Sequence, residues 1–180
     1  MTGSDQDRQG AAALADLFET HYERIGRYIA VRIGSKDHAE ELAADVFVRA
    51  LERIDTFQWR GIPMQAWLFR IAHNLAVDHL RRNSRRPTTV LDDALNIAGN
   101  DNPEAEAMNS MQREELLKAM ESLTSAQREV VTLRFFGGLS SVEVADVVRR
   151  SHGAVRELQS SGLKSLRRVL GIGTPTALES

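Results

Sequence analysis

The 180-residue sequence contains no cysteine, and this absence excludes several kinds of chemistry. Without thiols the chain can form no disulfide, use no cysteine nucleophile and build no cysteine-ligated zinc site. The histidines, at positions 21, 38, 73, 79 and 152, show no HExxH-like pairing. We therefore expect neither a metal site nor a cofactor.

Long apolar runs are also missing from the sequence. No stretch approaches the roughly 20 apolar residues that a membrane-spanning helix needs, and the opening MTGSDQDRQG lacks the basic-then-apolar pattern of a secretion signal. Hydrophobic residues make up 42% and charged residues 27% of the chain, which is ordinary for a soluble globular protein. The composition predicts a cytoplasmic protein.

The net charge of -2 hides an uneven distribution of charge along the chain. Residues 1–86 hold 13 Lys and Arg against 12 Asp and Glu, residues 87–107 hold none against 5, and residues 108–180 hold 10 against 8. Two neutral-to-basic parts therefore flank an acidic segment. Such asymmetry occurs in nucleic-acid-binding proteins that carry an acidic segment.

Apolar residues at helical spacing predict an all-α fold without strands. In the first part of the chain, one helix is expected from about residue 12 to 33 and a second from 37 to 54. Asp37 and Glu40 have the spacing of a capping box for the second helix. Residues 1–11 are polar and are expected to be disordered.

The stretch 57–86, FQWRGIPMQAWLFRIAHNLAVDHLRRNSRR, gives the clearest indication of function. A helix is expected after Pro63, which suits a first helical turn. Its buried stripe comprises Met64, Trp67, Leu68, Ile71 and Leu75, and its other faces carry Arg70, His73, Asn74, Asp78, Arg81 and Arg82. An apolar back, a polar front and a basic end favour nucleic-acid binding, although a basic helix end also simply complements the helix dipole.

Residues 87–107 lose this periodicity and gather Asn, Asp, Gly and Pro. That composition predicts a flexible acidic linker between two small helical domains. The expected organisation is a disordered N-terminus (1–11), a first domain (12–86), the linker (87–107), a second domain (108–170) and a tail (171–180).

The second domain has the pattern of a helix-turn-helix. Thr124 with Gln127, and Ser140 with Glu143, have capping-box spacing and open two helices. A further helix begins near Ser151, at the distance typical of the motif. This last helix would lie in the major groove of DNA and present His152, Arg156, Gln159 and Ser160.

Three motifs, in this order, resemble an extracytoplasmic-function (ECF) sigma factor of the bacterial sigma-70 family. HAEELAADVFVRAL resembles the helix with which the family binds core RNA polymerase, and AWLFRIAHNLAVDHLRR resembles its segment for melting and reading the -10 promoter element. LTSAQREVVTLRFFGGLSSVEVADVV followed by GAV resembles its -35-binding domain. The resemblance covers about residues 12–170 and implies an alternative sigma factor that joins core polymerase and recognises both promoter elements.

The resemblance also implies roles for particular residues. Contacts with core polymerase are expected at Glu40, Glu41, Leu42, Asp45, Phe47 and Arg49. Contacts with -10 DNA are expected at Trp59, Arg70, Asn74, Asp78, Arg81 and Arg82, where Asp78 is alternatively an i,i+4 partner of Arg82. Contacts with -35 DNA are expected at Arg149, Arg150, Ser151, His152, Arg156, Gln159, Ser160 and Lys164. The implied partners are the beta and beta-prime subunits of polymerase, promoter DNA and an anti-sigma factor.

The sequence departs from the family pattern at several positions. Ala44 stands where the polymerase-binding helix usually has Gln, which predicts a weaker contact there. Arg149 and Arg150 stand where the helix-turn-helix turn usually has Gly and an apolar residue. Leu158 and Gly162 replace residues that are commonly Arg and Ala in the recognition helix, which predicts weak or unusual -35 binding.

Two other functions fit parts of the sequence. A helix-turn-helix repressor or activator that does not join polymerase would be a stable homodimer, because half-sites are usually read by symmetric pairs. A metal-dependent hydrolase would use His38 with Glu40, Glu41 and Asp45. Because those carboxylates point to several faces of one helix, we do not expect an enzyme.

Overall fold

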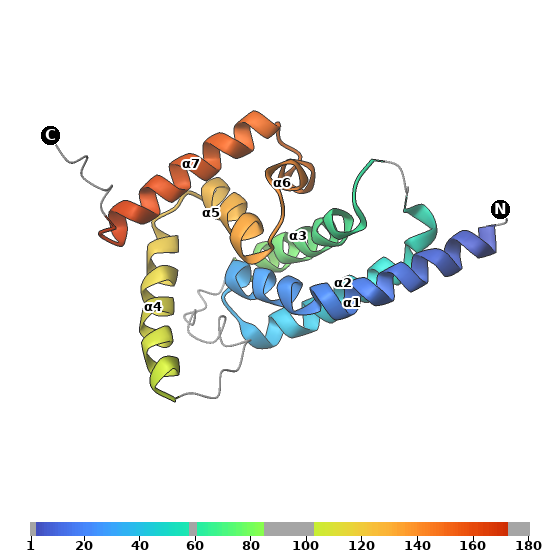
Figure 1. The fold of residues 1–180 in the computed structure, drawn as a ribbon, viewed down its shortest axis with the longest axis horizontal. Coiled ribbons are helices and arrows are strands. Elements are labelled where there is room, and N and C mark those ends of the chain that lie inside the picture. Colours follow the sequence, from blue (N-terminus) through green and yellow to red (C-terminus); the bar gives the residue numbers. More distant parts are fainter. Residues whose placement is uncertain (1–2, 58–60, 85–102, 173–180) are drawn as a thin grey trace, which may run out of the picture.

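The computed structural model describes residues 3–57, 61–84 and 103–172, and these ranges contain helices and no strand (Figure 1). The α-helices are α1 (Gly3–Ile33), α2 (Lys36–Glu52), α3 (Met64–Asn83), α4 (Pro103–Glu121), α5 (Ser125–Val131), α6 (Ser141–Val148) and α7 (His152–Val169). A 3-10 helix, Ile54–Thr56, follows α2, and a π-helix, Thr132–Phe136, follows α5. The predicted all-α class is confirmed. None of the described helices is long and apolar enough to cross a membrane.

Helices α1, α2 and α3 pack side by side as the N-terminal unit. Their apolar faces meet in a core that includes Ile25, Tyr28 and Ile29 of α1, Val46 of α2 and Phe69 of α3, all without exposed area. The rings of Tyr28 and Phe69 meet edge to face with their centroids 5.8 Å apart. Aromatic pairs in this geometry add stabilisation beyond the area that they bury.

The beginnings of α1 and α2 differ from the sequence prediction. Helix α1 starts at Gly3, so the expected disorder of residues 1–11 is wrong from Gly3 onward, and residues 1–2 lie outside the described part. Although the segment is polar, it favours a helix for two reasons. The alanines at 11–13 are good helix formers, and Asp5 in the first turn interacts favourably with the helix dipole. Helix α2 is capped by Ser35, whose side chain accepts a hydrogen bond from the backbone N–H of His38, and not by Asp37.

The C-terminal unit, which comprises α4 to α7 and the π-helix, follows the predicted capping pattern closely. Both capping boxes form, Thr124 with Gln127 and Ser140 with Glu143, so the starts of α5 and α6 are confirmed. Arg149 ends α6 in the left-handed conformation, with φ 54° and ψ 47°. Helices α6 and α7 and the turn between them form the helix-turn-helix (Figure 1).

Helix α4 begins within the segment that the sequence assigned to the linker. Its first residue is Pro103, so residues 103–107 are helical, while residues 87–102 lie outside the described part. Proline is well suited to the first turn of a helix, and the alanines and glutamates that follow it are strong helix formers. Four side chains near the end of α4 form a second apolar cluster with α5, α7 and Val31: Leu117, Ala119, Met120 and Leu123.

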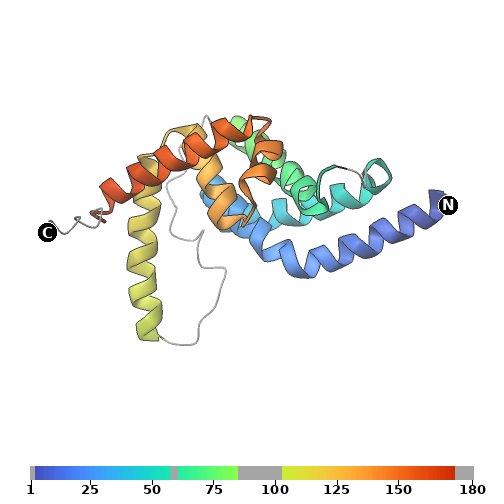
Figure 2. The same ribbon diagram turned by 45° about the horizontal axis from the view of Figure 1, so that its top comes forward.

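The two units pack against each other along α3. Helix α6 lies across α3, and the π-helix lies against α1, as both views show (Figures 1 and 2). The main apolar cluster runs through this contact, because it joins Leu68 and Phe69 of α3 to Leu139 and Val144 of the C-terminal unit. We call this contact the seam.

The fold predicts different effects of substitution at two phenylalanines. Phe69 is fully buried and Phe135 is 54% exposed. We expect Phe69→Ala to lower the free energy of unfolding by about 3–5 kcal/mol, because it removes a buried ring and leaves a cavity. Phe135→Ala should change it by about 0.5 kcal/mol or less. Urea denaturation measures both, and equal effects of the two substitutions would contradict this packing.

Candidate nucleic-acid interface

Helix α3 carries the residues that the sequence assigned to the -10 element. Asn74, Arg81 and Arg82 are exposed, and Asp78 is half-buried. Arg81 Nη2 lies 3.2 Å from Asp78 Oδ1, so the carboxylate pairs with the residue three positions on, and not with Arg82. This pair is exposed and contributes little to stability, which leaves Arg81 able to exchange it for a phosphate. Trp59, assigned to the same site, lies outside the described residues.

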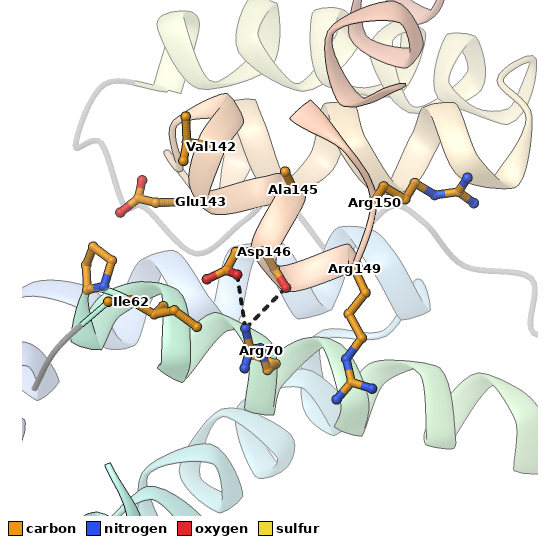
Figure 3. Close-up of a pocket in the computed structure, with 10 residues that line it drawn as sticks. Ile62, Arg70, Val142, Glu143, Ala145, Asp146, Arg149 and Arg150 are labelled. Atoms are coloured by element: carbon orange, nitrogen blue, oxygen red, sulfur yellow. Dashed lines mark hydrogen bonds and ion pairs between the residues drawn. The ribbon is translucent and has the colours of Figure 1, made fainter. Parts of the chain in front are cut away.

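Arg70, in contrast, is engaged across the seam. Its Nη2 lies 3.4 Å from Asp146 Oδ1 and 3.3 Å from the backbone oxygen of the same residue (Figure 3). Arg149 and Arg150, from the helix-turn-helix turn, line the same groove of about 500 Å³. The structure therefore places one predicted -10 residue and two predicted -35 residues around a single groove. It does not leave Arg70 free to bind DNA while the seam is closed.

Two further polar contacts join the units beside this groove. The Arg24 guanidinium donates from Nε and Nη2 to the backbone oxygen of Gly137, at 3.1 and 2.6 Å. Gln65 donates to the carboxylate of Glu143, which also caps its own helix. Partial burial raises the pKa of Glu143, but hydrogen bonds from Gln65 and Ser140 outweigh burial, so the net pKa lies below its usual value.

The most buried charges of the seam form a cluster around Glu129 of α5. Arg32 Nη2 lies 3.5 Å from Glu129 Oε1, with side chains 9% and 15% exposed. His73 Nδ1 lies 3.4 Å from the same oxygen and 3.2 Å from the Tyr28 hydroxyl. Burial lowers the pKa of His73, and together with Arg32 it outweighs the opposite effect of Glu129. Burial raises the pKa of the Tyr28 hydroxyl. We conclude that the His73 imidazole is neutral near pH 7.

The helix-turn-helix presents most of the predicted -35 residues to solvent. Arg149, Arg150 and Ser151 are exposed in the turn before α7, and Arg156, Ser160 and Lys164 are exposed on α7 itself. His152 is exposed too, and its Nε2 lies 2.8 Å from Ser141 Oγ. Gln159 is half-buried and accepts a hydrogen bond from Arg134 Nε at 2.9 Å, so it is partly occupied within the protein.

Gly162 has a packing role that explains this departure from the family pattern. It is buried in α7, and a Cβ at this position would lie only 3.0 Å from Cγ2 of Val131. The neighbouring Ser161 accepts a hydrogen bond from Gln127 Nε2 at 3.0 Å. Glycine therefore lets α7 approach α5 closely, at the usual entropic expense of glycine in a helix.

Helix α2 carries the residues assigned to core polymerase. Glu40, Glu41, Asp45 and Arg49 are exposed and Leu42 is half-buried. Phe47 is only 7% exposed and packs edge to face on Phe18, with ring centroids 4.8 Å apart, so its side chain supports the helix from inside. Exposed apolar residues, Val48 (55%) and Leu51 (57%), accompany the charges on this helix.

The comparisons with known proteins agree with this architecture. A family model described as Sigma-70 region 2 matches residues 17–86, and one described as Sigma-70, region 4 matches residues 119–168. The chain is 31% identical over 163 residues to the ECF RNA polymerase sigma factor SigD of Mycobacterium bovis, which covers 86% of this chain and 76% of SigD. The chain belongs to the ECF RNA polymerase sigma factors.

Other ECF sigma factors are similar to this one. It is 37% identical over 161 residues to BldN of Streptomyces coelicolor, covering 89% of this chain, and spans 61% of the length of BldN. Among solved structures, RpoE of Bartonella quintana, in complex with the anti-sigma factor NepR, superimposes with a TM-score of 0.70. That match covers 89% of this chain and 98% of RpoE at 21% identity, and it shows that the two share a fold.

The sequence did not reveal the residues that hold this sigma factor closed. In the sequence, Arg24, Arg32 and Glu129 resemble ordinary surface charges on amphipathic helices. No neighbouring residue indicates their partners, which lie far away in the sequence.

The buried charges of the seam predict unequal effects of two carboxylate substitutions. Glu129→Gln should lower the free energy of unfolding by about 3 kcal/mol, because it leaves the nearly buried Arg32 unpaired. Glu114→Gln, which removes an exposed pair with Lys118, should lower it by less than about 1 kcal/mol. Thermal denaturation measures the stability of both variants. If Glu129→Gln destabilises the protein as little as the control Glu114→Gln does, the buried charges of the seam do not contribute to stability.

His73 predicts that the seam weakens in mild acid. Its pKa is lower in the folded protein than in the unfolded chain, so its contribution is complete above the unfolded value of about 6.5 and is lost as pH falls below it. The free energy of unfolding should therefore fall between about pH 7.5 and 5.5, and His73→Gln should flatten that dependence. Stability that rises in acid would mean instead that protonated His73 pairs with Glu129.

Proposed function

We propose that this protein is an alternative sigma factor that binds core RNA polymerase and directs initiation at promoters with specific -35 and -10 elements. It would act without catalysis of its own, in the cytoplasm, where the beta and beta-prime subunits and promoter DNA are available. The observation that carries the proposal is the order of the two matches, region 2 and then region 4, together with the helix-turn-helix formed by α6 and α7.

The chemistry of the two surfaces supports this proposal. On α3, Asn74 and Asp78 offer groups that can read base edges, while Arg81 and Arg82 offer charge for phosphates. On α7, Arg156 and Lys164 are exposed on a helix of the size that enters a major groove. The exposed mixture of acidic and apolar residues on α2 suits a protein partner.

The closed seam implies a separation step. Two promoter elements about 25 base pairs apart lie roughly 85 Å apart on straight DNA, at about 3.4 Å per base pair. Because α3 contacts α6 directly, the two DNA-binding surfaces do not span that length in this arrangement. We propose that binding to polymerase opens the seam and thereby releases Arg70 from Asp146.

An anti-sigma factor is the second partner that we propose. The RpoE structure is a complex with an anti-sigma factor, and its sigma factor shares the fold of this chain. A protein that covers α2 and holds the seam closed would prevent both polymerase binding and promoter binding.

In vitro transcription tests the proposed function. The full chain is added to bacterial core polymerase that lacks any other sigma factor, on a pool of genomic promoter fragments. Initiation at specific fragments is expected, and sequencing their starts gives the -10 and -35 elements. A stable homodimer that binds DNA but not core polymerase would contradict the sigma function and favour a repressor or activator.

The two DNA surfaces predict separable defects. Arg81→Ala together with Arg82→Ala should reduce open-complex formation at least about tenfold while core binding is unchanged, because both arginines are exposed and are proposed to contact DNA phosphates. Arg156→Ala should instead weaken binding that depends on the -35 element by about 1–3 kcal/mol. Permanganate footprinting and gel-shift assays measure the two steps, and loss of core binding by the double variant would refute this division.

A further inference from the structure

The groove of about 500 Å³ beside Arg70 is built by both units, and we call it the seam groove. The N-terminal unit contributes Ile62, Pro63 and Arg70, and the C-terminal unit contributes α6 and the turn that follows it (Figure 3). Pockets that bind small molecules have volumes of about 300–1,000 Å³. The seam groove therefore has room for a small ligand that touches both units at once.

The charged residues that line the seam groove are net positive, with three arginines against two carboxylates. Both carboxylates are already engaged, because Asp146 pairs with Arg70 and Glu143 accepts two hydrogen bonds from other residues. Arg149 and Arg150 are exposed, and neither has an ion pair or a side-chain hydrogen bond within the described ranges. A concave site lined by unbalanced positive charge attracts anions.

Two of these arginines are placed so that one anion can reach both. Within the described part of the chain, Arg70 donates to Asp146 from Nη2 alone, and its Nε is buried without a hydrogen-bond partner. Arg149 extends from the turn toward α3, the helix that carries Arg70 (Figure 3). Guanidinium groups bind phosphate oxygens through two parallel N–H groups, so a phosphate between these two side chains would use donors that the protein leaves unused.

The backbone of Arg149 indicates that its side chain has a use beyond the turn. Among the described residues, it is the one residue other than glycine with a positive φ, at 54°. Glycine makes such a turn at less conformational cost, so the turn itself does not explain an arginine here. Residues held in this conformation are often found at functional sites.

The rest of the seam groove offers an apolar wall. Ile62 and Pro63 line it from the N-terminal unit, and Val142, which is 63% exposed, lines it from α6. An organic group attached to a bound phosphate would find apolar contacts from both units there.

We infer that the seam groove binds a small free organic phosphate, with its phosphate between Arg70 and Arg149 and its organic group on the apolar wall. A ligand that contacts both units favours the closed arrangement, since it binds that arrangement better than an open one. It also competes with any use of Arg149 on DNA. The inference goes beyond the proposed promoter function and does not require polymerase, because the whole groove belongs to one chain.

NMR chemical-shift titration of the full chain tests the inference, with magnesium-free inorganic pyrophosphate as the first probe. The wild-type chain should bind it with a Kd of about 1 mM or below at roughly 0.1 M salt. Arg149→Gly should weaken binding about tenfold, because it removes one charged donor group. That variant should unfold at no lower temperature than the wild type, since glycine suits the left-handed turn. Arg70→Lys keeps a positive charge beside Asp146 but loses the guanidinium fork, and should weaken binding about threefold.

Arg113→Ala, which removes an arginine from α4 outside the seam groove, is the matched control and should leave binding unchanged. Adenosine diphosphate, which joins an organic group to the same pyrophosphate, should bind more tightly than pyrophosphate alone. Weaker binding of adenosine diphosphate would contradict the role of the apolar wall.

Three results would overturn the site. The first is no binding of pyrophosphate to the wild-type chain up to about 10 mM, and the second is an Arg149→Gly variant that binds as well as Arg113→Ala. The third is a loss of binding in Arg149→Gly but not in Arg70→Lys, which would place the anion on the turn alone. If the wild-type chain binds a random duplex of about 20 base pairs and no pyrophosphate, the turn arginines serve only the DNA backbone, and the inference fails while the proposed function stands.

Discussion

The ion pair between Arg32 and Glu129 is the interaction on which the arrangement of the two units depends. Both side chains are nearly buried, so each charge is tolerated only because the other is present. His73 completes the cluster as a neutral ring. Apolar packing through Phe69 alone would hold the units together without fixing their orientation, whereas paired buried charges require one particular alignment.

Helix α3 has two roles: it packs against the C-terminal unit, and it carries residues of the proposed DNA-binding surface. One face carries Gln65, Arg70 and His73 toward the C-terminal unit. Another face carries Asn74 and Asp78 toward solvent and α2. Closing the seam therefore removes Arg70 from the proposed DNA surface and leaves Asn74 exposed. The closed form keeps part of the proposed promoter surface and hides the rest.

The sequence predicted what local chemistry decides. Capping boxes at Thr124 and Ser140 depend on neighbours within a few residues, and the structure confirms them. The seam was not predictable, because it joins α1 and α3 to residues about 60 to 110 positions later, and such pairing depends on tertiary packing. Phe47 shows a further limit: its spacing fits an inner face, and the structure buries it, whereas family resemblance alone suggested an external contact.

The absence of cysteine makes the separation of the two units directly measurable. Glu52→Cys at the end of α2 and Glu157→Cys on α7 are both exposed and outside the seam, so a spin label on each reports the distance between the units. Free protein should give one narrow distribution of distances, and addition of core polymerase should shift it to distances longer by tens of Å, up to the roughly 85 Å that promoter spacing requires. An unchanged distribution in a polymerase complex that initiates transcription would contradict opening of the seam.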